Sequence, residues 1–407
     1  MHPLAGSVSP ETSLCSTAMN RTWPGRTAPW IRPPIAEITR QAAHYRTQGK
    51  DLIDLGQAIL GLAPAENAKQ RVRDYLEIPG PQSYSPDPGL PELRQAIAHL
   101  LIHRKAVSAA CAERVMVTCG ASQAFANALF TVTNPGDEII TFEPGYFDHN
   151  YAIAMASCRQ VPVALRLREN SYDFDLEAVV SALTPHTRAI VLVSPANPTG
   201  AVACPSFVER LCDLCRSRDI WLLSDETYDL FTFSPYSTTS PAAVDPTGKV
   251  MVLGSFSKTL GLAGWRIGYL YGPEPAIEEA YKVQDSLVVC ASVASQHAAL
   301  GALECLDSYV SFARQELTKR KDTLVSVLRA VSSLRPRMPR GATFLLATLE
   351  DQQDDIAFCH RLLAEAGVIA VPGSAFGPHG KGTIRLSFGN LPCESIQKAG
   401  ERIKKMG

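Results

Sequence analysis

Five short apolar segments recur between about Val115 and Gly272, separated by loops and amphipathic stretches. They are RVMVTCG, DEIITFEPG, RAIVLVSPANPTG, IWLLSDETY and KVMVLGSFSK. Each is nearly continuous in Val, Ile, Leu and Met instead of alternating with polar residues, which is typical of strands buried on both faces of a mostly parallel sheet. SQAFANALFTV and PSFVERLCDLCRSR lie between them and are predicted to be helices. The sequence therefore predicts an α/β fold with a doubly wound, mostly parallel sheet.

The two ends of the chain follow a different pattern. QELTKRKDTLVSVLRAV is predicted to be an amphipathic helix, and GATFLLATL and TIRLSFG are predicted to be strands of a smaller sheet. PPIAEITRQAAHYRTQG, near the N-terminus, predicts a further helix. We therefore expect a large domain over residues 62–300, a small α+β domain built from 31–61 together with 301–407, and a tail over 1–30.

Composition argues against several classes of protein. The 407 residues carry a net charge of −1 and are 19% charged, so we expect no nucleic-acid partner, which would usually require a basic face. No apolar run approaches the ~20 residues of a membrane span, so no membrane partner is expected. The first twenty residues lack the apolar core of a signal peptide, and a cytoplasmic location is expected.

The eleven cysteines do not form a recognisable disulfide framework, because they are odd in number and scattered over a long chain. Cys212 and Cys215 make a C-x-x-C, but they lie within a predicted amphipathic helix, near the same face as Leu211 and Leu214. No second C-x-x-C exists to complete a tetrahedral metal site. We therefore expect these two side chains to pack in the core and predict no metal site.

Each of the five apolar segments ends in polar or conformationally special residues. These are Gly120–Ser122, Tyr146, Asn197, Asp225 and Lys258. Open α/β sheets bind their ligands beyond the carboxyl ends of the strands. The five loops are therefore expected to converge on one site.

Two of these residues carry the strongest chemical signal. Lys258 follows a strand and is surrounded by small and apolar residues, an environment that lowers the pKa of an amine and makes it a nucleophile. Asp225 ends a buried strand, where an unpaired carboxylate would be costly, so it faces a cationic ring nitrogen, forms a salt bridge or caps the next segment. Tyr228 follows three residues later and can present its hydroxyl to the same ligand.

A second group of residues is suited to an anion and to a carboxylate. Gly120 lies between a strand and a helix, where free backbone N–H groups bind phosphate, unless the turn is an ordinary one with Ser122 as the N-cap. Arg266 and Ser255 are available as further phosphate contacts. Arg385, in TIRLSFG, suits bidentate carboxylate recognition or is an exposed strand residue.

Taken together, the motifs resemble those of the class I/II aminotransferases, a family of fold-type I pyridoxal-phosphate enzymes. The matching motifs, in family order, are SYSPDPGLPELRQAI, TCGASQA, EPGY, NPTG, DETYDLF, SFSKTLGLAGWRIGY and TIRLSFG. The resemblance covers the chain from about residue 30 to its end. The resemblance implies pyridoxal 5′-phosphate as cofactor and transfer of an amino group between an L-amino acid and a 2-oxo acid.

The resemblance also implies roles around the cofactor ring. Lys258 matches the lysine that holds pyridoxal phosphate as an internal aldimine and later moves a proton. Asp225 matches the partner of the pyridinium nitrogen. Asn197 and Tyr228 match the ligands of the ring O3′, and Tyr146 matches the aromatic residue that stacks on the ring.

Further roles follow for the phosphate and for the subunit contact. Arg266 and Ser255 match phosphate ligands, joined by the backbone around Ala121 and Ser122. Tyr84 matches a tyrosine that reaches the phosphate of the neighbouring subunit, which implies a homodimer. On the substrate side, Arg385 matches the arginine that binds the α-carboxylate, with Gly56 and Asn197 beside it.

Three segments depart from the family pattern. The loop around Gly56 reads LGQAILGLAP and lacks the usual Pro-Asp-Phe, Thr343 and Phe344 replace a common aromatic pair, and CASVASQ lacks a proline. Because these loops shape the substrate pocket, elimination or cyclisation of an amino acid by a specialised lyase or cyclase remains the alternative. Asp285 would favour a basic, arginine-like substrate if it faced the pocket, and is otherwise a helix-surface charge. A ligand sensor fused to a DNA-binding module is not expected, because only about thirty residues precede the domain.

Overall fold

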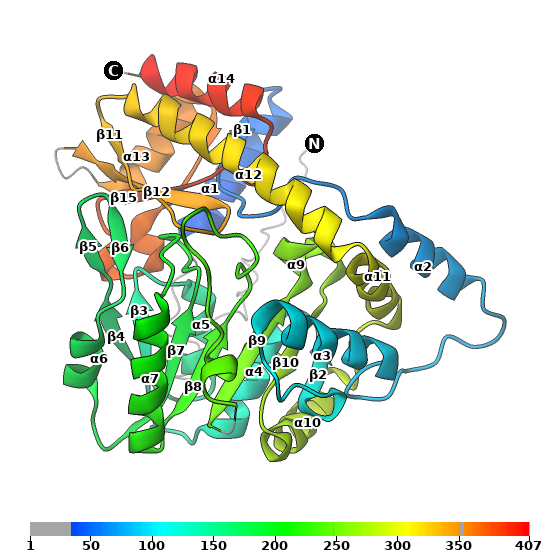
Figure 1. Cartoon of the computed structure of the whole chain (residues 1–407). Helices are drawn as coiled ribbons and strands as arrows, with labels where there is room; N and C mark the ends of the chain where they lie inside the picture. Colours follow the sequence, from blue (N-terminus) through cyan, green and yellow to red (C-terminus); the bar gives the residue numbers. More distant parts are fainter. Residues whose placement is uncertain (1–33, 247, 351–353, 407) are drawn as a thin grey trace, which may run out of the picture.

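The computed structural model describes residues 34–246, 248–350 and 354–406, and its largest sheet has seven strands (Figure 1). In sheet order they are β2 (Val115–Thr118), β10 (Gly268–Tyr271), β9 (Val250–Ser255), β8 (Trp221–Asp225), β7 (Thr187–Val193), β3 (Glu138–Glu143) and β4 (Arg159–Ala164). β10 is antiparallel to both of its neighbours, whereas all the other pairs are parallel. The predicted mostly parallel sheet is confirmed, and all five apolar segments form strands; β4 and β10 were not predicted.

Both faces of this sheet are buried, and successive residues of a strand face opposite sides. In β2, Val115 and Val117 belong to the core on one face and Met116 to the core on the other. The first face is covered by α3 (Pro91–Lys105), α7 (Pro205–Arg218) and α11 (Val293–Glu304), the second by α4 (Ala121–Val132), α5 (Phe147–Met155) and α10 (Glu274–Val288). This double burial explains why the strands read as continuous apolar runs.

A second core forms around a smaller antiparallel sheet. Its strands, in order, are β11 (Leu334–Pro336), β12 (Phe344–Leu349), β15 (Thr383–Ser387) and β14 (Val371–Pro372), next to the pair β1 (Ile53–Asp54) and β13 (Val368–Ile369). Among the helices here are α1 (Pro34–Thr47), α12 (Leu306–Arg329), α13 (Asp355–Arg361) and α14 (Cys393–Lys404). The helices and strands predicted at both ends of the chain are therefore present. The division into two domains with these boundaries stays a prediction, and residues 1–30 lie outside the described part.

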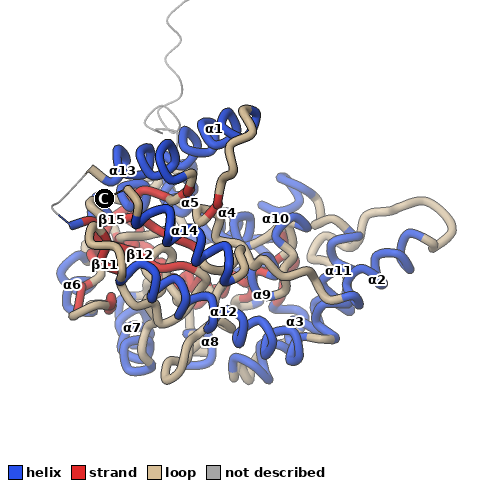
Figure 2. Tube along the Cα trace, turned by 90° about the horizontal axis from the view of Figure 1, so that it is seen from above, coloured by secondary structure: helices blue, strands red, loops and turns tan. Residues whose placement is uncertain are grey.

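The segment between α2 (Glu66–Leu76) and α3 projects from the rest of the chain in both views (Figures 1 and 2). It carries Tyr84, whose side chain is 80% exposed. By contrast, Cys212 and Cys215, on α7, are buried in the core as expected, and burial raises the pKa of Cys212 to about 12.

A buried ion cluster fastens α3 to the carboxyl end of β8. The ammonium of Lys105, the last residue of α3, lies 2.6 Å from Asp229 Oδ2 and 2.9 Å from Glu226 Oε2, and none of the three side chains is more than 7% exposed. Glu226 directly follows Asp225, and Asp229 directly follows Tyr228. The cluster therefore fixes the turn that carries two of the predicted site residues.

Replacing Lys105 with methionine is expected to lower the free energy of unfolding by about 3–5 kcal/mol, because it leaves two carboxylates buried without their cation. Lys282→Met is the matched control: Lys282 pairs with Glu279 at 2.7 Å on the surface, where loss of a pair costs less than about 1 kcal/mol. Urea unfolding of both variants beside the parent protein measures the difference. Equal losses in the two variants would contradict the role given to the cluster.

Candidate active site

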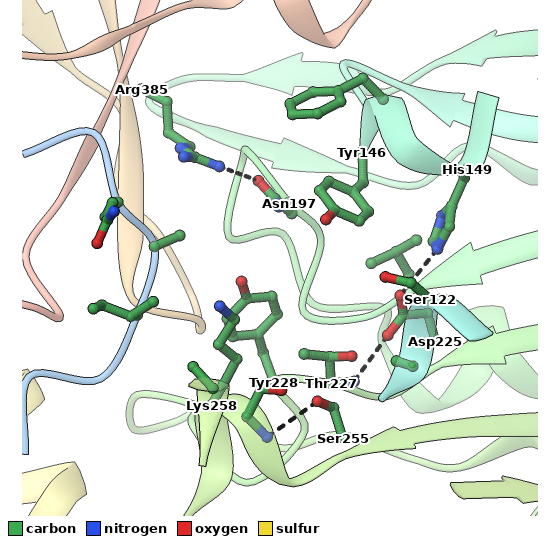
Figure 3. Close-up of a pocket in the computed structure, with 18 of the residues that line it drawn as sticks. Ser122, Tyr146, His149, Asn197, Asp225, Thr227, Tyr228, Ser255, Lys258 and Arg385 are labelled. Carbon is green, nitrogen blue, oxygen red and sulfur yellow. Dashed lines mark hydrogen bonds and ion pairs between the residues drawn. The ribbon is translucent and has the colours of Figure 1, made fainter. Parts of the chain in front are cut away.

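A cavity of about 380 Å³ lies at the carboxyl ends of the central strands (Figure 3). The predicted site residues that line it are Gly56, Ala121, Ser122, Tyr146, Asn197, Asp225, Tyr228, Ser255, Lys258, Arg266 and Arg385. The structure thus brings the five strand-end loops together, and β15 of the smaller sheet adds Arg385. Of the predicted site residues, Gly120 and Tyr84 do not line the cavity.

Lys258 lies on the short helix α9 (Phe256–Thr259), which follows β9 directly. The Ser255 hydroxyl caps this helix by accepting a hydrogen bond from the Ser257 N–H at 3.2 Å. Burial, with Arg385 and Arg266 nearby, lowers the pKa of Lys258 to about 8. Among the described residues its amine has no hydrogen-bonding or ion-pair partner. A neutral, unengaged amine is therefore accessible near physiological pH.

Asp225, at the end of β8, is held on both carboxylate oxygens. His149 Nε2 lies 3.2 Å from Oδ2, and the Thr227 N–H donates to Oδ1 at 3.0 Å. Burial alone would raise the pKa of Asp225, but these hydrogen bonds outweigh it and lower the pKa. The carboxylate therefore stays ionised inside the cavity. The hydrogen bond from the Thr227 N–H also caps the segment that follows β8.

His149 is a site residue that the sequence analysis missed. It lies on α5, three residues after Tyr146, and one helical turn brings both side chains to the same cavity. Its ring packs against Phe125 with centroids 4.1 Å apart. The spacing of three residues from Tyr146, at the end of a predicted strand, was the only available signal.

The backbone around Gly120 forms a compact cradle beside Arg266. Gly120 has φ = +83°, and a Cβ there would lie 2.9 Å from Arg266 Nη2. Arg266 Nη1 donates to the Ala263 carbonyl at 3.0 Å, which orients the guanidinium. Gly120 is the N-cap of α4, and Ser122 is the second residue of the helix, so the interpretation of Ser122 as N-cap is wrong. Free N–H groups at a helix start beside a guanidinium suit an anion such as phosphate.

Arg385 is buried at 4% exposure, so the interpretation as an exposed strand residue is wrong. Its Nη1 donates to Asn197 Oδ1 at 3.0 Å and its Nη2 donates to the Gly56 carbonyl at 2.7 Å, while the buried Nε has no partner among the described residues. The guanidinium also packs on the rings of Phe344 and Phe376, 5.2 and 5.0 Å from their centroids. A buried, oriented and incompletely satisfied arginine is suited to bind a carboxylate.

Two tyrosines complete the lining. The Tyr146 hydroxyl donates to Asp148 Oδ2 at 2.6 Å, and the Tyr228 ring packs edge-on against Phe344 with centroids 5.2 Å apart. Burial raises the pKa of both Tyr146 and Tyr228, so both keep their hydroxyl protons. Asp285, by contrast, lies on α10 and does not line the cavity.

A comparison with protein families gives a match over residues 50–403 to the family described as aminotransferase class I and II. The chain belongs to this family. Of its relatives, the aromatic aminotransferase ISS1 of Arabidopsis thaliana is 32% identical over 92% of both chains. The arginine–pyruvate transaminase AruH of Pseudomonas aeruginosa is 32% identical over 88% of this chain and 92% of its own. The solved aspartate aminotransferase from Thermus thermophilus with maleate superposes with a TM-score of 0.88 at 31% identity, covering 95% of this chain and all of its own.

The protein is therefore an aminotransferase with the α/β fold of the pyridoxal-phosphate-dependent enzymes, and elimination or cyclisation is not favoured. Members of this family act on amino acids and keto acids, generally depend on pyridoxal phosphate and are typically dimers. In the described part of the chain, no helix is both long and apolar enough to cross a membrane.

The residues of this aminotransferase fit pyridoxal phosphate. Lys258 offers an unengaged amine, Asp225 an ionised carboxylate, and the α4 start with Arg266 an anion cradle. At Gly120 a side chain would collide with that cradle. The aldehyde, the ring nitrogen and the phosphate of the cofactor thus each have a chemically matched group in the same cavity.

Proposed function

We propose that this aminotransferase moves the amino group of an L-amino acid to a 2-oxo acid using pyridoxal phosphate attached to Lys258. The observation that carries the proposal is the combination, in one cavity, of an amine with a pKa of about 8 and the buried carboxylate of Asp225. A lysine with a lowered pKa is at once a competent nucleophile and a competent proton carrier.

Pyridoxal phosphate, when bound, supplies an aldehyde that condenses with amino groups and a ring that draws electrons from the substrate Cα. The Lys258 amine would hold the cofactor and, when free, would accept the proton that leaves the substrate Cα. Asp225 would keep a proton on the ring nitrogen, and Tyr146 would pack on the ring. Asn197 Oδ1 already accepts from Arg385, which leaves its amide N–H₂ to donate to the ring oxygen together with the hydroxyl of Tyr228.

The remaining residues bind the anionic groups. Arg266, Ser255 and the backbone at Ala121 and Ser122 bind the phosphate, helped by the positive end of the α4 dipole. At the far side of the cavity, the guanidinium of Arg385 binds the substrate α-carboxylate. The cofactor and the substrate are thereby held at both ends, which orients the bond to be broken.

The active unit is proposed to be a homodimer in which Tyr84 reaches the phosphate site of the neighbouring subunit. Two observations support this: the Tyr84 side chain is 80% exposed, and it stands on a projecting segment outside the cavity of its own chain. We also propose a cytoplasmic location, in keeping with eleven cysteines that are scattered without a disulfide pattern.

A half-reaction tests the proposed function. The cofactor-loaded protein, mixed with a single L-amino acid and no 2-oxo acid, is expected to release one equivalent of 2-oxo acid per site and to retain pyridoxamine phosphate. Mass spectrometry of the released cofactor and an assay for the 2-oxo acid measure both products. Continuous turnover with release of ammonia would instead identify a lyase and contradict the proposal.

A further inference from the structure

Among the described charged side chains that line the active-site cavity, Arg385 is the one that hydrogen-bonds to the segment following β1. In Figure 3, Asp225, His149, Ser122 and Ser255 lie at one end of the cavity and Arg385 at the other. The ionisable groups that line the cavity, apart from its tyrosines, are His149, Asp225, Lys258, Arg266 and Arg385. Each has a role in the proposed function or pairs with a residue that has one.

The wall beside Arg385 consists of neutral residues. The segment 56–59 passes next to the guanidinium, since the Gly56 carbonyl accepts from it at 2.7 Å, and Gln57, Ala58 and Ile59 line the cavity. The four residues of this segment are uncharged, and the described charged side chain of the cavity lining that hydrogen-bonds to them is Arg385.

Aromatic packing makes the same region apolar. Ala58 packs against the small core that contains Tyr228 and Phe344. Phe147 lines the cavity, and its ring centroid lies 5.6 Å from that of Phe376. The Phe376 ring in turn lies against the Arg385 guanidinium. A substrate held through its α-carboxylate on Arg385 therefore places its side chain along a surface of aliphatic and aromatic carbon.

From this arrangement we infer that the enzyme selects amino acids with neutral, mainly apolar side chains and discriminates against acidic and basic ones. A charged substrate side chain on this wall would lose its hydration without meeting a counter-ion among the described residues of segment 56–59, which is costly. An apolar side chain would gain free energy by burial. The inference rests on the proposed function, because it uses the α-carboxylate contact at Arg385.

Leucine, asparagine and aspartate provide a matched test, because their side chains share one branched shape and differ in polarity and charge. We expect kcat/KM to decrease in that order and to be at least about 100-fold lower for aspartate than for leucine. Norleucine against lysine gives the corresponding comparison for a basic group. If kcat/KM for aspartate or lysine equalled that of its neutral counterpart, the inference would be overturned and the proposed transamination would stand. If the enzyme transaminated no amino acid at all, the proposed function itself would be contradicted.

A substitution at Ile59 tests whether the segment 56–59 causes the discrimination between neutral and charged side chains. Ile59→Lys places a cation beside the substrate side chain and is expected to raise the aspartate-to-leucine ratio of kcat/KM at least about tenfold, whereas Ile59→Met, which keeps the apolar surface, leaves it unchanged. Dissociation constants of 2-methyl-leucine and 2-methyl-aspartate, which have no Cα hydrogen to lose, give a second readout that needs no turnover. If the aspartate-to-leucine ratio of kcat/KM is unchanged in Ile59→Lys, the inference is overturned. If that variant does not fold, the same ratio in the parent enzyme decides whether the inference stands.

Discussion

Replacing Lys258 with alanine is expected to lower kcat for transamination by about 10⁴-fold or more, because the variant loses its proton carrier together with its nucleophile. The structure gives the reason: the amine lies within the cavity, has a pKa near 8, and no other lysine lines the described part of that cavity. Steady-state assays measure the loss in kcat. Borohydride reduction followed by mass spectrometry of the intact protein is expected to fix the cofactor to the parent chain and not to the variant.

Lys258→Arg is the control for charge and bulk, because a guanidinium stays protonated and cannot replace the amine. A further readout is pH: covalent uptake of pyridoxal phosphate by the apoprotein requires the neutral amine of Lys258. The lowered pKa therefore predicts a rate that rises with pH and reaches half its maximum near pH 8. Covalent attachment or near-normal turnover in the alanine variant would refute the assignment of Lys258.

The strands of the large sheet could be predicted from the sequence where burial on both faces requires a continuous run of apolar residues. The five strands with helices on both faces read as continuous apolar runs, and all five were found from that pattern alone. β4 lies at the edge of the sheet, is only partly buried and contains Pro162, so no apolar run identifies it. β10 begins within the motif SFSKTLGLAGWRIGY, which ends at Tyr269, so no separate apolar run identifies it.

The site was predictable from position more than from residue type. Lys258, Asp225 and Asn197 were found because they follow strands that end at the same edge of the sheet. His149 was not predicted as a site residue, because it lies within α5 and a histidine inside a helix is equally suited to ordinary packing. The burial of Arg385 against Phe344 and Phe376 was not predicted either, because these contacts depend on how three separate segments in and beside the smaller sheet pack together.

Asp225→Ala is expected to lower kcat by about 10²–10³-fold, because the variant no longer holds a proton on the ring nitrogen and charge developing at the substrate Cα is left without that stabilisation. Asp213→Ala is the matched control, since Asp213 is 71% exposed on α7 and should leave kcat unchanged. A cofactor analogue methylated at the ring nitrogen keeps its positive charge without a carboxylate. It should therefore restore activity to Asp225→Ala more than to the parent enzyme.

The contact with His149 adds a pH dependence of defined sign to this prediction. In His149→Phe the hydrogen bond to Asp225 is lost, and burial, which raises the pKa of that carboxyl, is opposed by fewer interactions. The carboxylate should then take up a proton at a higher pH than in the parent enzyme, so the variant is expected to lose activity earlier as the pH is lowered. The acidic limb of the kcat profile measures this shift. If Asp225→Ala retained full activity, or if the limb stayed in place in His149→Phe, Asp225 would not act as the ionised partner of the cofactor ring.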